Sequence, residues 1–204
     1  MSDRKTLVVI GPNYGDAQIA ELCNCHSEVY LIEPLPEVCR WLRTHNYGNP
    51  NVHVIEAACG AEEGLATFNR YNKDGLSSSI GSPTAESKQL YCGVDLSLQG
   101  SITVDVINAC KWLEARGLDS IETLLVDAQG MDLTILKTFA SWLNRSAIRV
   151  IQCEADGKGK RMYDGVGDNS EEGFDRFMSQ FPQYQKRKLA GRVTWNPDIV
   201  WEVT

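Results

Sequence analysis

The sequence predicts an α/β fold, a Rossmann-like, doubly wound sheet formed by a single domain over residues 1–204. Three observations predict it. Short apolar segments rich in β-branched residues alternate with helix-like segments, which is typical of a parallel sheet covered on both faces. A glycine turn, GPNYG, joins the first of these strands to the first helix. The length of 204 residues and the composition, with 43% hydrophobic and 23% charged residues, are those of an ordinary globular domain.

The elements follow from local patterns. Apolar runs predict strands at Leu7–Ile10, Val29–Ile32, Val52–Ala57, Thr123–Val126 and Ile148–Cys153. Helical periodicity predicts helices at Asp16–Cys25, Pro36–His45 and Met131–Leu143, and another near Glu171–Phe181. The second of these helices begins with a proline, a residue favoured at a helix start.

Two regions interrupt the alternation. Residues 72–100 and 155–173 are rich in glycine, serine or charge and have no sustained period, which predicts two long loops. In a parallel sheet both would leave the edge where the strands end. The chain finishes with two strand-like runs around a turn at Asn196-Pro197, which predicts an antiparallel hairpin closing the sheet.

Composition limits the partners and the compartment. The net charge of −7 does not favour nucleic-acid binding, which relies on clustered Lys and Arg. The seven cysteines are scattered, and Cys23 and Cys25 lack the spacing and the partner pair of a zinc site, which favours a reducing compartment. No segment resembles a signal peptide or approaches the roughly 20 apolar residues of a membrane span. We therefore expect a cytoplasmic protein with no membrane partner, and nothing predicts its oligomeric state.

The glycine turn alone does not name a ligand. A phosphate-binding loop would need Lys and Ser or Thr after the last glycine, but Gly15 is followed by Asp16, which would repel a phosphate. The spacing from Gly11 to Gly15 also differs from the dinucleotide pattern GxGxxG. A tight turn that holds no ligand therefore stays an alternative.

The second strand favours a nucleoside. Glu33 ends this apolar strand 18 residues after Gly15, where a carboxylate can accept hydrogen bonds from both hydroxyls of a ribose. Such charge-assisted bonds contribute about 1.5–3 kcal/mol each. A carboxylate there also disfavours the 2′-phosphate of NADP. The alternative is an acid that is merely exposed at a strand end.

Five segments taken together carry a resemblance. In chain order they are VIGPNYGDAQIA, VYLIEPLPEVCRWLRTH, NVHVIEAACGAEEGLATF, GLSSSI and LLVDAQGMDLTILKTF. From about residue 7 to residue 154 the chain resembles the FkbM family of S-adenosylmethionine-dependent methyltransferases. The resemblance implies the class I methyltransferase fold, a seven-stranded, mostly parallel sheet with an antiparallel last strand. It also implies S-adenosylmethionine (SAM) as cofactor and methyl transfer, usually to an oxygen of a sugar, polyketide or other small metabolite.

The same resemblance implies roles for individual residues. Cofactor contacts are expected at Gly11, Asn13, Gly15, Glu33, Glu56, Ala57 and Asp127. A serine cluster that includes Ser78 matches family serines near the cofactor or acceptor, and Gln129 takes the Glu/Gln place of the family's Asp-x-Glu/Gln-Gly motif. Asp127 and Glu154, each at a strand tip, are the expected catalytic residues.

The segment 155–173 is the expected acceptor lid. Its polar side chains could contact an anionic or sugar-like substrate, and we expect such contacts from Lys158, Arg161 and Tyr163. The alternative is a surface loop with no contact role.

One position departs from the family. Members commonly begin the first motif with an acid, DVGANxG, and the aligned residue here is Val9. Pro12 stiffens the same turn. Asp16 is the residue that could partly replace the missing carboxylate.

Methyl transfer is an in-line displacement, so alignment supplies much of the rate, about 7–11 kcal/mol in well-oriented reactions. If the acceptor is a hydroxyl, Asp127 is the expected general base. A divalent ion held by Asp127 and Glu154 is an alternative that the sequence does not favour. Two other functions stay open: an NAD-dependent oxidoreductase, and a non-catalytic nucleoside-binding module of the same fold.

Overall fold

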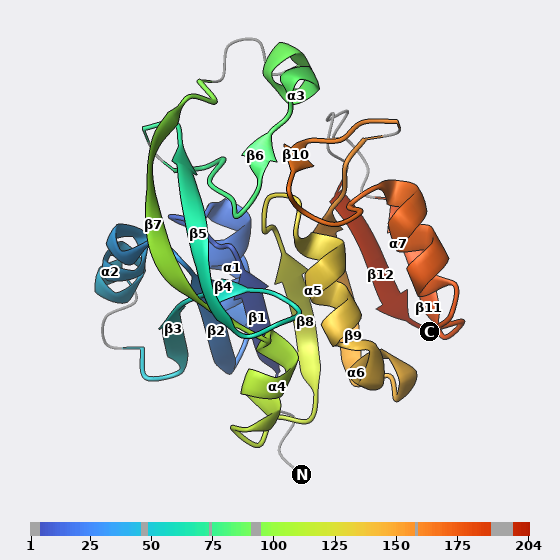
Figure 1. Cartoon of the computed structure of the whole chain (residues 1–204). Helices are drawn as coiled ribbons and strands as arrows, with labels where there is room; N and C mark the ends of the chain where they lie inside the picture. The colour runs from blue at the N-terminus through green and yellow to red at the C-terminus, as the bar shows by residue number, and fades with distance from the viewer. Residues whose placement is uncertain (1–4, 46–48, 74, 91–94, 158, 189–197) are drawn as a thin grey trace.

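The computed structural model describes residues 5–45, 49–73, 75–90, 95–157, 159–188 and 198–204. Its centre is a seven-stranded sheet of order β11-β12-β9-β8-β1-β2-β3 (Figure 1). Every neighbouring pair is parallel except the two made by β12, which runs antiparallel to β9 and β11. The predicted α/β fold with a C-terminal antiparallel hairpin is therefore confirmed. The strands are β1 Thr6–Ile10, β2 Glu28–Glu33, β3 Val52–Glu56, β8 Ile121–Val126, β9 Ile148–Glu154, β11 Tyr184–Lys188 and β12 Asp198–Val203.

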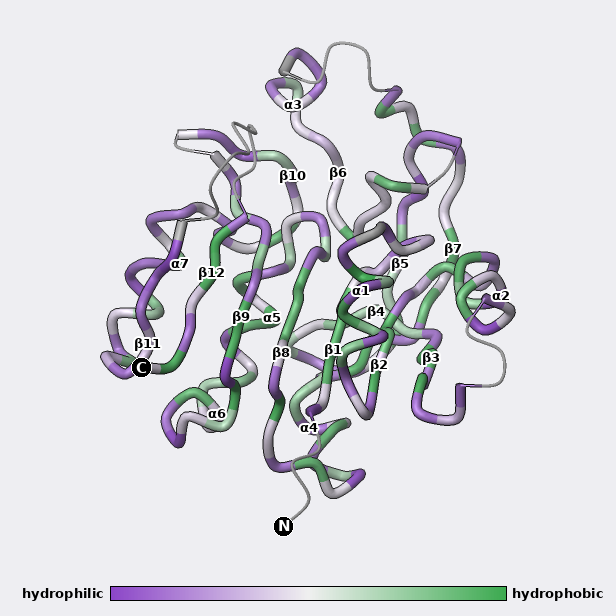
Figure 2. Tube along the Cα trace, turned by 180° about the vertical axis from the view of Figure 1, so that it is seen from behind, coloured by the Kyte–Doolittle hydropathy of each residue, from purple (hydrophilic) through white to green (hydrophobic). Residues whose placement is uncertain are grey.

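Helices cover both faces of this sheet because alternate strand residues point to opposite sides. In β1, Leu7 and Val9 join an apolar cluster with side chains of two helices, residues 17–25 and 36–45, whereas Val8 and Ile10 join a second cluster with side chains of helices that lie between residues 109 and 178. The central strands β1 and β8 carry long hydrophobic stretches (Figure 2). Helices α1 Ala17–Cys25 and α2 Pro36–His45 thus lie on one face, opposite α4 Ala109–Glu114, α5 Asp132–Thr138, α6 Ala140–Asn144 and α7 Glu171–Met178.

One predicted helix is two. The segment expected as a single helix over residues 131–143 breaks at Phe139, where the backbone leaves helical geometry and the N–H donates to Leu136 O. The apolar period continues across the break because Phe139 and Trp142 are both fully buried in the same cluster. Periodicity alone therefore could not reveal the break.

A second sheet lies where the sequence showed little structure. β4 Ala58–Cys59, β7 Leu98–Ile107 and β5 Gly64–Tyr71 form three strands in the order β4-β7-β5. β5 is largely exposed, which weakened its pattern, whereas β7 does alternate, with Val104 and Val106 buried and Thr103 and Asp105 exposed, so its signal was present in the sequence and was missed. Residues 72–100 are accordingly not one long loop, and this expectation was wrong. The segment contains β6 Ser82–Pro83, α3 Ala85–Leu90 and the start of β7.

The two interrupting segments meet each other. β10 Tyr163–Asp164, within the expected lid, pairs antiparallel with β6, and Tyr163 lies opposite Pro83. Both strands lie beyond the carboxyl edge of the large sheet, at the top of Figure 1. The predicted turn at Asn196-Pro197 lies outside the described residues. In the part of the chain that the structure describes, no helix is long and apolar enough to cross a membrane.

Candidate functional site

A cavity of about 430 Å³ opens at the carboxyl edge of the large sheet. This volume falls within the range of about 300–1,000 Å³ that is typical of small-molecule pockets. The wall is built from the turn after β1, the ends of β2 and β8, and the start of β12. It is the position where doubly wound sheets bind their ligands.

The turn after β1 needs its glycines. Gly11 and Gly15 have φ values of +77° and +73°, in the left-handed region that glycine adopts without strain. A Cβ on Gly11 would also lie 1.9 Å from the carbonyl oxygen of Asp127. The Gly11 N–H donates to Ile32 O at 2.9 Å, so the turn is held against both β2 and β8.

Glu33 ties the end of β2 to this turn. Its side chain is only 3% exposed, yet it lies on the cavity wall. One carboxylate oxygen accepts the Asn13 N–H at 3.1 Å, and the other accepts the Leu35 N–H at 3.0 Å. Burial raises the pKa of Glu33 to about 7, although these two donors oppose the rise and the charge of Asp127 adds to it.

Asp127 follows β8 directly and faces the same cavity. Its Oδ1 accepts the side-chain amide of Gln129 at 2.6 Å. Desolvation raises the pKa of Asp127 to about 6, the Gln129 donor opposes the rise, and the negative charges of Asp198 and Asp16 add to it. Its carboxyl group therefore titrates close to the neutral range.

The cavity wall contains most of the predicted site residues. These are Gly11, Asn13, Gly15, Glu33, Ala57, Ser78, Asp127 and Gln129. Glu56 is not among them, because its exposed carboxylate forms an ion pair with Arg43 at 3.2 Å. Glu154 lies behind the wall, 3.4 Å from the amide nitrogen of Gln129. Lys158 lies outside the described residues.

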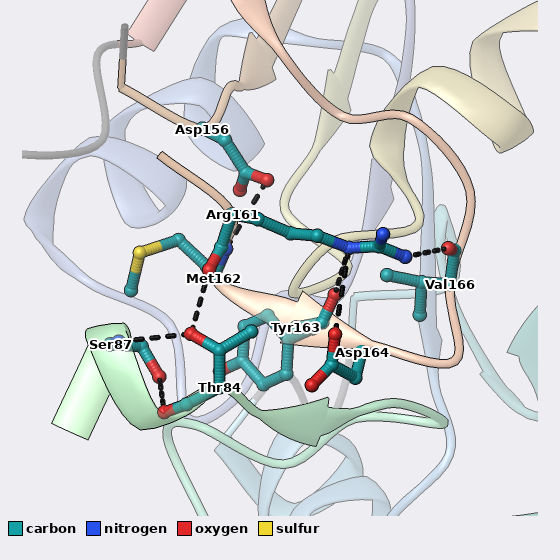
Figure 3. A network of polar contacts seen from close by, with 8 residues as sticks. All are labelled: Thr84, Ser87, Asp156, Arg161, Met162, Tyr163, Asp164 and Val166. Carbon is teal, nitrogen blue, oxygen red and sulfur yellow. Dashed lines mark hydrogen bonds and ion pairs between the residues drawn. The ribbon is translucent and has the colours of Figure 1, made fainter. Parts of the chain in front are cut away.

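Two described basic residues of the expected lid, Arg161 and Lys160, bind groups of the two interrupting segments. The Arg161 guanidinium donates to Tyr163 O at 3.1 Å and Val166 O at 3.0 Å, and it lies 3.7 Å from Asp164 (Figure 3). Lys160 donates to Glu86 at 2.6 Å. Neither residue lines the cavity, so the structure does not bring Arg161 to the place where an acceptor would meet Asp127.

Sequence reasoning missed several wall residues, among them Asp198 and Gln152. Asp198 begins β12 and lies opposite Glu154 in the sheet. Because β12 is antiparallel, its first residue lies at the edge where the parallel strands end, and the predicted hairpin could have indicated this. Within the described ranges no three His, Cys, Asp or Glu side chains are arranged to hold a metal ion.

Val9, the residue at the family's acidic position, does not reach the cavity. It is fully buried in the apolar cluster between its strand partners Leu31 and Leu125. A carboxylate there would pay a large desolvation cost. The charged side chains on the described wall are instead Asp16, Glu33, Asp127 and Asp198, all acidic.

Comparison with solved structures shows the same fold at low sequence identity. A methyltransferase FkbM from Methylobacillus flagellatus KT superposes with a TM-score of 0.60 at 13% identity over 99% of this chain, which spans 44% of that protein. Precorrin-6y C5,15-methyltransferase from Geobacter metallireducens GS-15 superposes with a TM-score of 0.51 at 12% identity, and the match covers 99% of this chain and 81% of that protein. A human methyltransferase 10 domain containing protein superposes with a TM-score of 0.51 at 10% identity, and the match covers 98% of this chain and 72% of that protein.

Sequence comparison agrees at the level of the family. No curated protein sequence matches this chain. The family model described as the methyltransferase FkbM domain matches residues 10–184, which include the glycine turn, Glu33 and the Asp127 motif. The chain therefore belongs to the FkbM methyltransferase family.

Proposed function

We propose that this chain transfers a methyl group from SAM to a small-molecule acceptor, with SAM bound in the cavity at the carboxyl edge. The observation that carries the proposal is the meeting of the glycine turn, the buried Glu33 and Asp127 around that cavity. When bound, SAM supplies an electrophilic methyl group on a positively charged sulfur. The protein's own task is then to bind, align and exclude water.

The residues present fit this cofactor. Glu33 offers carboxylate oxygens to ribose hydroxyls, and Leu35, Ala58 and Phe68 offer apolar surface to an adenine ring. The acidic wall suits a ligand with a net positive charge. The backbone of Gly11 and Gly15 permits close approach of the methionine part, since no side chain intervenes.

We further propose a hydroxyl group on a small, sugar-like compound as the acceptor. Asp127 would accept its proton as general base, because its carboxyl group faces the cavity and its pKa is raised to about 6. Removing the proton as the oxygen attacks would make the oxygen a stronger nucleophile. The loop before β6, which contributes Gly75, Leu76, Ser78 and Ile80 to the wall, would then enclose the acceptor.

Calorimetry with SAM, S-adenosylhomocysteine and NAD tests the cofactor. We expect binding of the first two, and loss of at least about tenfold in affinity in Glu33→Ala, since one charge-assisted hydrogen bond contributes about 1.5–3 kcal/mol. Glu63→Ala, an exposed carboxylate away from the cavity, is the matched control. Binding of NAD alone would support the oxidoreductase alternative. Binding of none of the three would support a module without catalysis.

Turnover is measured with methyl-labelled SAM and methyl α-glucoside as a probe acceptor. Asp127→Ala should still bind SAM but lose transfer by about 100-fold or more, the usual contribution of a general base. Transfer near the parent rate in this variant would show that Asp127 is not the base.

A further inference from the structure

Gln129 joins the carboxylates of the site to the segment around β10. Its Nε2 lies 2.6 Å from Asp127 Oδ1 and 3.4 Å from Glu154 Oε2, while its Oε1 lies 2.8 Å from the Tyr163 hydroxyl. An ionised carboxylate can only accept hydrogen bonds, and a tyrosine hydroxyl can donate one. The amide therefore has one favourable orientation, with its NH₂ group toward the carboxylates and its oxygen toward Tyr163.

The tyrosine sets this orientation. Its hydroxyl has one proton, and it lies 2.8 Å from Gln129 Oε1 and 3.1 Å from Ser77 O. The shorter contact is the one to the amide. If the amide turned over, its NH₂ group would face the hydroxyl and its oxygen would face Asp127, so two acceptors would be placed against each other.

The backbone at this point is held as well. Gln129 has a φ of +49°, which is uncommon for a residue other than glycine. The Ser79 hydroxyl donates to Gln129 O at 2.7 Å. The next residue, Gly130, packs against the Tyr163 ring, since a Cβ there would lie 3.2 Å from it. Both interrupting segments therefore contact Gln129, through Ser79 from one and Tyr163 from the other, and Tyr163 also packs against Gly130.

We propose that Tyr163 is a positioning residue that orients the Asp127 carboxylate through the Gln129 side-chain amide and does not contact the acceptor. This inference rests on the proposed function, in which Asp127 is the base. Tyr163 is only 5% exposed and does not line the cavity, which supports an indirect role over the substrate contact that the sequence suggested.

The charges around Asp127 make such a donor useful. The groups that face it from neighbouring elements are acidic: Asp16 before α1, Glu33 of β2, Asp132 of α5, Glu154 of β9 and Asp198 of β12. Mutual repulsion would push an unheld carboxylate away from its neighbours. The Gln129 amide offsets this by donating to two of the carboxylates at once.

The decisive experiment follows the Gln129 side-chain amide by nitrogen-15 NMR and needs no turnover. Tyr163→Phe removes only the hydroxyl and keeps the ring on Gly130. We expect exchange of the Gln129 amide protons with water to accelerate about fivefold or more, the effect of losing one typical hydrogen bond. Tyr71→Phe is the matched control, because its hydroxyl lies 3.3 Å from Gly81 O in the same segment and is not bonded to Gln129. Equal exchange in all three proteins would overturn the proposal.

Kinetics with methyl α-glucoside separate positioning from acceptor contact. Tyr163→Phe should lower kcat about tenfold and leave the KM values for SAM and the glucoside within about twofold. Gln129→Met should lower kcat similarly, and the double variant should lose no more, because both changes remove the same interaction. A raised KM for the glucoside in Tyr163→Phe would show that Tyr163 contacts the acceptor. A loss of kcat in the double variant equal to the product of the two single losses would show that Tyr163 does not act through Gln129.

The proposed function and this inference fail differently. If the parent protein binds no SAM, the proposed function fails, while the amide exchange still reports whether Tyr163 holds Gln129. If SAM binds and the exchange rates do not differ, only the inference fails. Gln129→Glu is a second variant: it keeps an acceptor for Tyr163 but places a third carboxylate beside Asp127 and Glu154, so its kcat should fall at least as far as in Gln129→Met.

Discussion

Gly11 and Gly15 both occupy the left-handed region of backbone space, but only Gly11 also lies against another strand. A Cβ on Gly15 would come no closer than 3.9 Å to the Ile19 side chain, whereas one on Gly11 would lie 1.9 Å from Asp127 O. Both glycines need a left-handed backbone, but only Gly11 lacks space for a side chain. Alanine substitutions at the two positions therefore separate the cost of backbone strain from the cost of steric overlap.

We expect Gly15→Ala to lower the free energy of unfolding by about 1–2 kcal/mol, the cost of a left-handed alanine. Gly11→Ala should cost at least about 3 kcal/mol, because the ends of β1 and β8 must also move apart. Urea unfolding followed by tryptophan fluorescence measures both values. Equal losses in the two variants would mean that the contact with Asp127 relaxes easily.

Single residues also show that a family pattern does not predict which side chains reach the cavity. The resemblance implied cofactor contacts at both Glu33 and Glu56, which end adjacent strands at paired positions. Glu33 is buried on the cavity wall, but Glu56 is exposed and pairs with Arg43. Val9 is similar, since its alignment with an acid could not show that its side chain points into an apolar cluster. Which way a side chain points depends on neighbours that are distant in sequence.

At the scale of the element, Asp16 has two tasks at the start of α1. Its Oδ1 accepts the Ile19 N–H at 2.9 Å as the N-cap, and its side chain also lies on the cavity wall. The sequence predicted Asp16 as the first residue of the helix and as a partial substitute for the acid absent at Val9. The structure instead places Asp16 just before α1 as its N-cap, and the contribution of its charge to binding is still a prediction.

Two variants of Asp16 separate the cap from the charge. Asp16→Asn keeps a capping oxygen, so stability should change by less than about 0.5 kcal/mol, whereas Asp16→Ala should cost about 1 kcal/mol. SAM affinity should fall about threefold in both, the scale of one exposed charge. Thermal unfolding and calorimetry give the two quantities. Full affinity in Asp16→Asn would show that the charge contributes nothing.

The elements that escaped prediction did so for different reasons. β7 alternates buried Val104 and Val106 with exposed neighbours, so its local signal was present and was missed. β5 is largely exposed and ends at a bulge between Arg70 and Tyr71, which weakens its pattern. β6 and β10 are two residues long and exist because each pairs with the other. By contrast α2 was predicted with its observed bounds, because a proline start and one apolar side are local signals.

At the scale of the whole molecule, the acidic cavity links stability to pH. Burial raises the pKa of Glu33 from 4.5 to about 7, so between these pH values the folded chain holds a proton that the unfolded chain releases. Stability contributed by the protonated form is present at low pH and lost as pH rises through this window. Asp127, whose pKa is raised to about 6, acts in the same direction.

We therefore expect the free energy of unfolding to fall between pH 4.5 and pH 7, by about 3 kcal/mol from Glu33 alone. In Glu33→Gln the fall should be smaller, since one of the titrating groups is gone. Urea unfolding at pH 5, 6, 7 and 8 measures the two slopes. Parallel slopes in parent and variant would contradict a raised pKa at Glu33. Bound SAM should reduce the pH dependence of the parent's free energy of unfolding, because its ribose hydroxyls favour the ionised form of Glu33.

The sequence by itself determined the large sheet, the glycine turn, and the acids at the tips of β2 and β8, because these follow from local periodicity, from the special backbone freedom of glycine and from the rule that parallel strands end at one edge. Only the tertiary structure decided which side chains reach the cavity. Asp198 reaches it because β12 runs antiparallel, Arg161 does not because its own loop binds it, and Tyr163 meets Gln129 because β10 pairs with β6. The direction of β12 followed from the predicted hairpin, but the contacts of Arg161 and Tyr163 depend on packing between distant segments, which no local pattern of residues encodes.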